Sequence, residues 1–126
     1  MNLKPLADYV NPLVAPYRAF VYQMPESETD AAVLLPDVSR GAEINQYLPG
    51  YRQANFLVVT RSSDFTTGYT RCKQVADLLK VTTNTQVGVF LVKQCVQLTE
   101  ALPFRKSPGD FIEFSAEMRI YFIDLT

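Results

Sequence analysis

The sequence of 126 residues contains no histidine, and it has only two cysteines, Cys72 and Cys95. The absence of histidine excludes Ser-His-Asp and Cys-His nucleophilic sites and the side chain most often used as a general base. Two isolated cysteines without histidine also cannot supply the ligands of a zinc site. We therefore expect both thiols to be small, buried and reduced, and we expect no metal and no cofactor.

The sequence also has neither a large excess of one sign of charge nor a long apolar run. The formal net charge is −1, so the chain lacks the basic surface that binds a nucleic-acid backbone. It has no run of 18 apolar residues, and its first ten residues lack the basic start and apolar centre of a signal peptide. Five isolated glycines form no phosphate-binding loop. We expect no DNA binding by this chain alone, no membrane insertion, and a cytoplasm-like compartment.

The most regular pattern lies between Phe111 and Ile123. Apolar residues occupy the even positions from 112 to 122, whereas Glu113, Glu117 and Arg119 stand at odd positions. A period of two predicts a strand with one side in a core and the other in water. Two carboxylates on a solvated strand face lack the separate environments that acid–base catalysis requires, so we expect no enzyme activity.

Two segments have helical spacing. The longer, residues 64–80, follows the possible N-caps Ser62, Ser63 and Asp64. Its predicted apolar side consists of Phe65, Tyr69, Cys72, Val75, Ala76 and Leu79. The shorter helix spans Leu3–Val14, with Asn2 as its N-cap, and Pro12 and Pro16 are expected to end it.

Four further segments are rich in β-branched and aromatic residues. They are Ala19–Met24, Ala31–Leu35, Gln53–Arg61 and Phe90–Thr99. The first two are expected to form a hairpin whose tip, residues 25–30, is acidic. In the last, Phe90, Val92, Val96 and Leu98 are expected to point inward, opposite Lys93, Cys95, Gln97 and Thr99. Gln94 interrupts the inward set, which predicts a bulge or a polar network.

Two segments lose periodicity and read as loops, residues 36–52 and 101–110. Pro108-Gly109 suits a type II turn, so the strands before and after the second loop should pair antiparallel. Both loops mix aromatic, apolar and basic side chains, which either fold back on their own domain or contact another protein. The candidate interface residues are Arg40, Tyr47, Leu48, Tyr51, Arg52, Leu102, Phe104, Arg105 and Lys106.

These elements predict one small α+β domain that spans residues 1–126. Its sheet is expected to contain about five strands, mostly antiparallel or mixed. The main helix, at about residues 64–80, covers this sheet together with the short N-terminal helix.

The order of these elements is similar to that of the tail terminator proteins of long-tailed bacteriophages, a group also labelled minor capsid proteins. The resemblance is carried by YRQANFLVVTRSSDFTTGYTRCKQVADLL, FLVKQCVQLTEALPF and GDFIEFSAEMRIYFI. The matching features are the strand Phe56–Arg61, the helix ending in Leu78-Leu79, Pro103 in a loop, and Tyr121-Phe122. The acidic and glycine-bearing turn before the last strand is reduced here to residues 108–110.

The resemblance implies a structural virion protein whose copies form a six-fold ring on the head-proximal end of the tail tube. There the ring would stop tube growth and offer an attachment surface for the head connector. The implied partners are the chain itself, the tail tube protein and a head connector or adaptor protein, with assembly in the host cytoplasm. Genome DNA would pass the lumen without specific binding, because acidic groups repel phosphates. The candidate lumen residues are Glu26, Glu28, Asp30, Glu113 and Glu117.

Two alternatives stay open at this point. The same pattern would suit another neck, tail-completion or connector-adaptor protein. From a different class, the chain could be a cytoplasmic domain that binds a small molecule in a pocket lined by Tyr22, Tyr47 and Tyr51.

Overall fold

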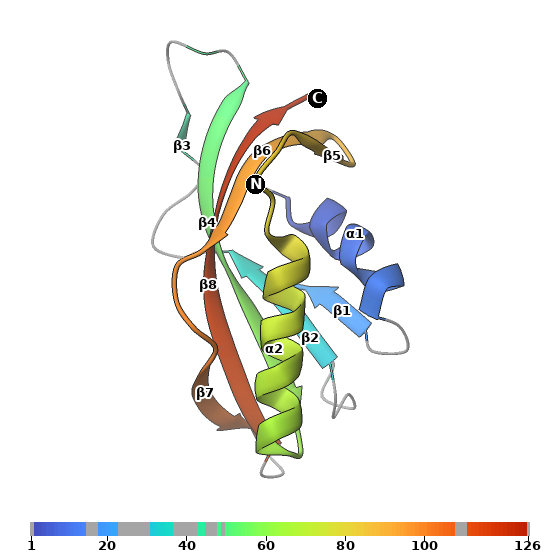
Figure 1. The fold of residues 1–126 in the computed structure, drawn as a ribbon, viewed down its shortest axis with the longest axis vertical. Helices are drawn as coiled ribbons and strands as arrows, with labels where there is room; N and C mark the ends of the chain where they lie inside the picture. The colour runs from blue at the N-terminus through green and yellow to red at the C-terminus, as the bar shows by residue number, and fades with distance from the viewer. Residues whose placement is uncertain are drawn as a thin grey trace.

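The computed structural model describes residues 2–14, 18–22, 31–36, 43–44, 48, 50–107 and 111–125, without the side chains of residues 43, 44, 104–107 and 111. Within these residues, eight strands form one curled mixed sheet that carries two helices (Figure 1). The helices are α1, Lys4–Val14, and α2, Phe65–Leu79. The strands are β1 Arg18–Val21, β2 Ala31–Pro36, β3 Glu43–Ile44, β4 Tyr51–Ser62, β5 Thr85–Val87, β6 Phe90–Gln97, β7 Leu102–Ser107 and β8 Phe111–Asp124. The predicted small α+β domain is confirmed, with more strands than expected.

The sheet is organised around the long antiparallel pair of β4 and β8, which runs from Tyr51 opposite Ile123 to Ser62 opposite Ile112. Each member of this pair has its other edge divided between two shorter strands. The outer edge of β8 pairs first with β7 and then with β6. The outer edge of β4 pairs with β3 and then with β2, and β1 lies beyond β2. The last strand is therefore central in the sheet.

One side of β8 is buried in the hydrophobic core, as predicted. The buried set on this strand is Phe114, Ala116, Met118, Ile120 and Phe122. Both helices pack against the same side of the sheet and share one core cluster with it. Because α2 lies over the β4–β8 pair and α1 over β1, the opposite side of the sheet carries no helix in the described part of the chain (Figure 1).

Helix α2 begins where the sequence predicted. The carboxylate of Asp64 accepts hydrogen bonds from the backbone N–H of Thr67, at 2.9 Å, and from its hydroxyl, at 2.7 Å. These two bonds, the side-chain one first, lower the pKa of Asp64. From Cys72 to Leu79 the predicted apolar side is buried. The two aromatic residues at the start of that side, Phe65 and Tyr69, are instead exposed.

Helix α1 also begins as predicted, because Asn2 Oδ1 accepts a hydrogen bond of 3.0 Å from Lys4 N–H. The helix ends at Val14, as predicted, but it continues through Pro12, which was expected to help end it. The burial of Val10 and Val14 against the sheet holds the last turn in place despite the missing N–H of proline.

The expected hairpin of the first two strands is wrong, because β1 and β2 pair in parallel, with Arg18 opposite Ala31 and Val21 opposite Leu34. A parallel pair requires the chain to return along the length of the first strand. Strand β1 has only four residues, and nine residues, 22–30, connect it to β2. At up to about 3.3 Å per residue they can make this return.

Strand β6 contains the predicted bulge, with a register shift between Val92 and Gln94. The extra residue reverses which side chains face the core beyond that point. Cys95, expected on the outer side, is buried, and its backbone forms a bridge to Val81. Leu98, expected inside, is exposed, so the predicted faces of this strand are wrong after the bulge.

The three additional strands come from segments outside the predicted strands. Residues 102–107 form β7, which pairs antiparallel with β8, and β5 pairs antiparallel with β6. The two-residue strand β3 lies inside the predicted loop 36–52. Strand β6 also pairs antiparallel with β8, as the turn chemistry predicted. The turn at Pro108-Gly109 itself lies outside the described residues.

Candidate functional site

The first group of predicted interface residues lies near the start of β4. Arg40 and Tyr47 are outside the described residues, and Leu48 is exposed. Tyr51 and Arg52 belong to β4 rather than to a loop, and they stand opposite Ile123 and Phe122 of β8. Arg52 Nη1 donates a hydrogen bond of 3.0 Å to the carbonyl of Tyr51, which holds the guanidinium beside the strand.

The second group lies on β7, where Leu102 is exposed and stands opposite Ser115. The backbone of Phe104, Arg105 and Lys106 belongs to the same strand, and their side chains are outside the described residues. Because β4 starts beside the end of β8 and β7 lies beside its beginning, the two groups occupy opposite ends of the sheet (Figure 1). They cannot form one surface on a single copy of the chain.

The predicted acidic group is also divided. Glu26, Glu28 and Asp30 lie outside the described residues. The expectation that Glu113 is solvated is wrong, because this side chain is only 2% exposed. Strands β4 and β7 flank it on both sides, and its Oε2 lies 3.5 Å from Arg61 Nη2. A carboxylate buried in this way beside a half-buried guanidinium is not exposed to repel DNA in a lumen.

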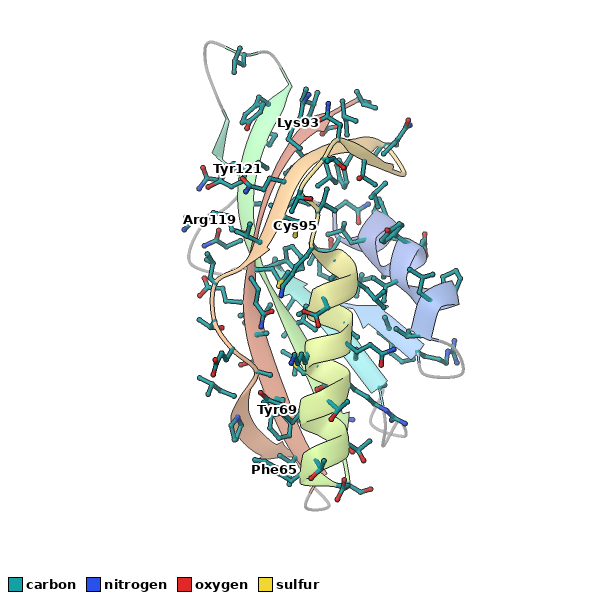
Figure 2. All side chains as sticks on the ribbon, viewed as in Figure 1. Phe65, Tyr69, Lys93, Cys95, Arg119 and Tyr121 are labelled. Atoms are coloured by element: carbon teal, nitrogen blue, oxygen red, sulfur yellow. The ribbon has the colours of Figure 1, made fainter. Side chains whose placement is uncertain are left out.

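The polar side of β8 contains a short hydrogen-bonded network on the side of the sheet away from the helices. Asn55 Nδ2 donates to Glu117 Oε1 at 3.3 Å, and Arg119 Nε donates to Asn55 Oδ1 at 3.1 Å. Figure 2 shows Arg119 and Tyr121 extending from β8 on the side away from α2. The network joins β4 to β8 and leaves Glu117 half-buried, in contrast to the enclosed Glu113.

Sequence reasoning missed an aromatic group at the start of α2. The ring of Phe114 lies 5.0 Å from that of Phe65 and 6.2 Å from that of Tyr69, both edge to face. Both helical rings cover Phe114 and expose their outer sides, near β7 (Figure 2). A strict helical stripe places these residues in the core. Their position in the first turns of α2 is the feature of the sequence that could have indicated this exposure.

Two of the cavities lined by described residues are open and adjoin the sheet. One, of about 310 Å³, lies between α2 and residues 97–101, and its lining includes Tyr69, Lys73 and Glu100. The other, of about 510 Å³, lies between α1 and β1, with Lys4 and Arg18 in its lining. Tyr22 and Tyr51 line neither cavity, and Tyr47 lies outside the described residues. The predicted tyrosine pocket for a small molecule therefore gains no support from these two cavities.

The two thiols are not poised for chemistry. Cys72 and Cys95 are buried in the core, and burial raises the pKa of Cys72 to about 11 and that of Cys95 to about 12. In the described part of the chain, no three His, Cys, Asp or Glu side chains gather where they could hold a metal ion. Neither described helix has the length and apolar character needed to cross a membrane.

The described residues form a small α+β domain built on one sheet, with exposed apolar side chains at its edges. Comparison with protein families gives the specific group: the family described as bacteriophage tail terminator protein matches residues 6–122. The chain therefore belongs to the bacteriophage tail terminator family, which confirms the resemblance found in the sequence. A search of curated proteins found no match. Members of this family are structural proteins of the phage tail.

Proposed function

We propose that copies of this chain form a six-fold ring on the head-proximal end of the phage tail tube. The ring stops the addition of tube subunits and provides the surface to which the head connector or adaptor attaches. The observation that carries this proposal is the family match, which extends over residues 6–122 and so includes nearly all of the sheet and both helices. The protein then resides at the head–tail junction of the virion, after assembly in the host cytoplasm, and has no enzyme activity.

The separation of the predicted interface residues supports this role. A ring built head to tail uses two different surfaces on each subunit, and a cap must also contact the tube and the connector. Leu48, Tyr51 and Arg52 lie at one end of β8, and Leu102 lies beside the other end. Surfaces at opposite ends of an elongated sheet can serve different partners simultaneously.

The chain's charge is compatible with DNA passing through the ring without binding. The net charge is −1, and the acidic residues proposed for the lumen are now Glu26, Glu28, Asp30 and Glu117. We omit Glu113 because it is enclosed beside Arg61. Repulsion between carboxylates and phosphates would keep the genome from adhering to the lumen.

Tail length tests the proposed function directly. Tails assembled in cells that lack this chain should be longer than normal in electron micrographs, because tube subunits keep adding to an uncapped end. Expression of the chain from a second copy should restore the normal length. Tails of normal length that fail to join heads would contradict the proposal and identify a connector-adaptor protein instead.

A test with purified components complements the one in cells. Tubes incubated with the purified chain should stop elongating and show extra density at one end only. Tubes that elongate equally with and without the chain, with no density at either end, would contradict capping.

A further inference from the structure

Four strands of the described sheet pair with one neighbour only, and each therefore has a free edge: β1, β3, β5 and β7. A free edge presents backbone N–H and C=O groups to which a strand of another chain can bond. Strands β3 and β5 have only two and three residues, and β7 contains Pro103 followed by a register shift. Short length, proline and bulges all protect an edge from pairing. Strand β1 is longer than β3 and β5, and it has neither a proline nor a register shift.

The pairing of β1 with β2 shows which backbone groups of β1 face its free edge. The N–H of Tyr22 donates to the carbonyl of Leu34 in β2 at 3.0 Å. Backbone groups of successive residues in a strand point to opposite sides, so those of Phe20 also point to β2. The N–H and C=O groups of Ala19 and Val21 therefore point away from β2, towards the cavity of about 510 Å³ between α1 and β1.

At this edge the side chain of Asn11 takes the place of a neighbouring strand. Its Oδ1 accepts a hydrogen bond of 2.8 Å from the N–H of Ala19, and its Nδ2 donates one of 3.0 Å to the carbonyl of Ala19. A residue of an antiparallel strand makes the same two bonds with the residue opposite it. Asparagine is a weak helix former, yet Asn11 stands inside α1. Its two bonds to β1 give a physical reason for an asparagine there.

Packing holds this amide at the edge, and the strand ends shortly beyond it. Val10 and Val14 of α1 are buried in the same core cluster as Ala19 of β1, so the helix lies at a fixed place beside the strand (Figure 1). Tyr22 has a φ of 65°, in the left-handed region that residues other than glycine rarely adopt. Its hydroxyl accepts a hydrogen bond of 3.0 Å from the N–H of Leu3, which ties the end of β1 to the start of α1.

We propose that Asn11 closes the free edge of β1 to pairing with a strand of another copy. Among the described residues of β1, Val21 alone then keeps outward backbone groups without a partner. One residue is too short a template for a strand pair. This inference goes beyond the proposed function and does not depend on it. A closed edge prevents pairing between copies whether or not the chain forms rings.

Hydrogen exchange of the Ala19 amide tests the contact itself. Asn11→Ala should speed this exchange by about tenfold, which corresponds to the loss of one hydrogen bond of ordinary net strength. Asp8→Ala is the matched control, because Asp8 is exposed on the same helix and its removal leaves Asn11 in place. It should leave the exchange of Ala19 unchanged. Equal rates at Ala19 in the two variants would overturn the proposal.

Sedimentation then tests the consequence for association. At concentrations where the unaltered chain and Asp8→Ala form the same species, Asn11→Ala should form species of at least about twice their mass. The reason is that two copies of an open β1 edge can pair with each other across a two-fold axis. An Asn11→Ala variant that sediments like Asp8→Ala would overturn the proposal.

A second substitution distinguishes edge pairing from loss of folding. Val21→Pro, added to Asn11→Ala, removes an N–H that points away from β2, and a proline at an edge blocks the addition of a strand. The double variant should return to the mass of the unaltered chain. Association caused by partial unfolding should instead stay the same or increase with the added proline. Either of these two results would overturn the proposal.

Discussion

Replacing Gly68 by alanine tests how closely α2 packs on the sheet. A Cβ atom at this position would lie 2.9 Å from Cε2 of Phe114 and 3.1 Å from Cβ of Ser62. The ring of Phe114 is fully buried and touched by Phe65 and Tyr69, so it has little room to move. The glycine is therefore required by close approach, although it lies inside a helix.

Two opposing effects decide the sign of this substitution. Alanine in place of glycine stabilises a helix interior by about 1 kcal/mol. Forcing an extra methyl group into a packed core costs about 1–3 kcal/mol. We expect overpacking to dominate, so Gly68→Ala should lower the free energy of unfolding by about 1 kcal/mol. The net loss should lie between roughly 0 and 2 kcal/mol.

Urea unfolding followed by circular dichroism measures this difference. With a slope of about 2 kcal/mol per molar urea, the midpoint of Gly68→Ala should fall by about 0.5 M. Thr70→Ala is the control on the exposed side of the same helix, where alanine should raise stability by up to about 0.7 kcal/mol. In a Phe114→Leu background the alanine at 68 should do less harm. A Gly68→Ala variant that is more stable than the unaltered chain would refute the packing argument.

Two further predictions concern buried ionisable groups. Burial raises the pKa of Cys72 to about 11 and of Cys95 to about 12 from 9.0, so the unfolded thiols ionise first as pH rises. The contribution of the two thiols to the free energy of unfolding is complete below pH 9. Above pH 9 it should fall by about 1.4 kcal/mol per pH unit for each thiol. A Cys95→Ala variant that loses stability as steeply as the unaltered chain in this range would contradict this reasoning. Glu113→Ala should lower the free energy of unfolding by about 1–3 kcal/mol, because it leaves the half-buried Arg61 without this carboxylate. Glu113→Gln should lower it less in the same assay, and equal stability of Glu113→Ala and the unaltered chain would refute the buried pair.

The parts of the fold that the sequence predicted well are those with a local signal. The period of two between Phe111 and Ile123 identified β8 and its buried face. The helical spacing after Asp64, with its capping side chain, located α2 to within one residue at each end. Both signals arise from neighbours in the chain, because side-chain direction follows backbone period directly.

Other parts of the fold depend on contacts between distant residues, and these were misread. The parallel pairing of β1 with β2 was not predicted, because the hydrophobic patterns of both strands suit a hairpin equally. The strand β7 has weak propensity, with Pro103 in it, and is ordered by pairing with β8. The bulge after Val92 was visible in the pattern, but its effect on Cys95 and Leu98 needed the register of β6 on β8.

The candidate surface residues also divide into those that the sequence indicated and those whose surroundings only the structure showed. The sequence drew attention to Leu102 because its segment mixes apolar and basic residues, and the structure places it exposed at an edge. Glu113 looked like a solvated acid, because strand alternation separates two faces but does not show which positions neighbouring strands enclose.

By itself, the sequence determined that this is a small α+β protein without histidine chemistry, and it was sufficient to indicate the tail terminator family, which the match over residues 6–122 confirmed. Composition and local periodicity are sufficient for the fold class and for the absence of histidine chemistry, because they constrain backbone conformation and available chemistry residue by residue. Only the tertiary structure decided that Glu113 is enclosed, that Phe65 and Tyr69 are exposed, and that the two groups of candidate interface residues lie at opposite ends of the sheet. Burial and surface shape are set by which strands become neighbours, and strand order is a long-range property of the folded chain.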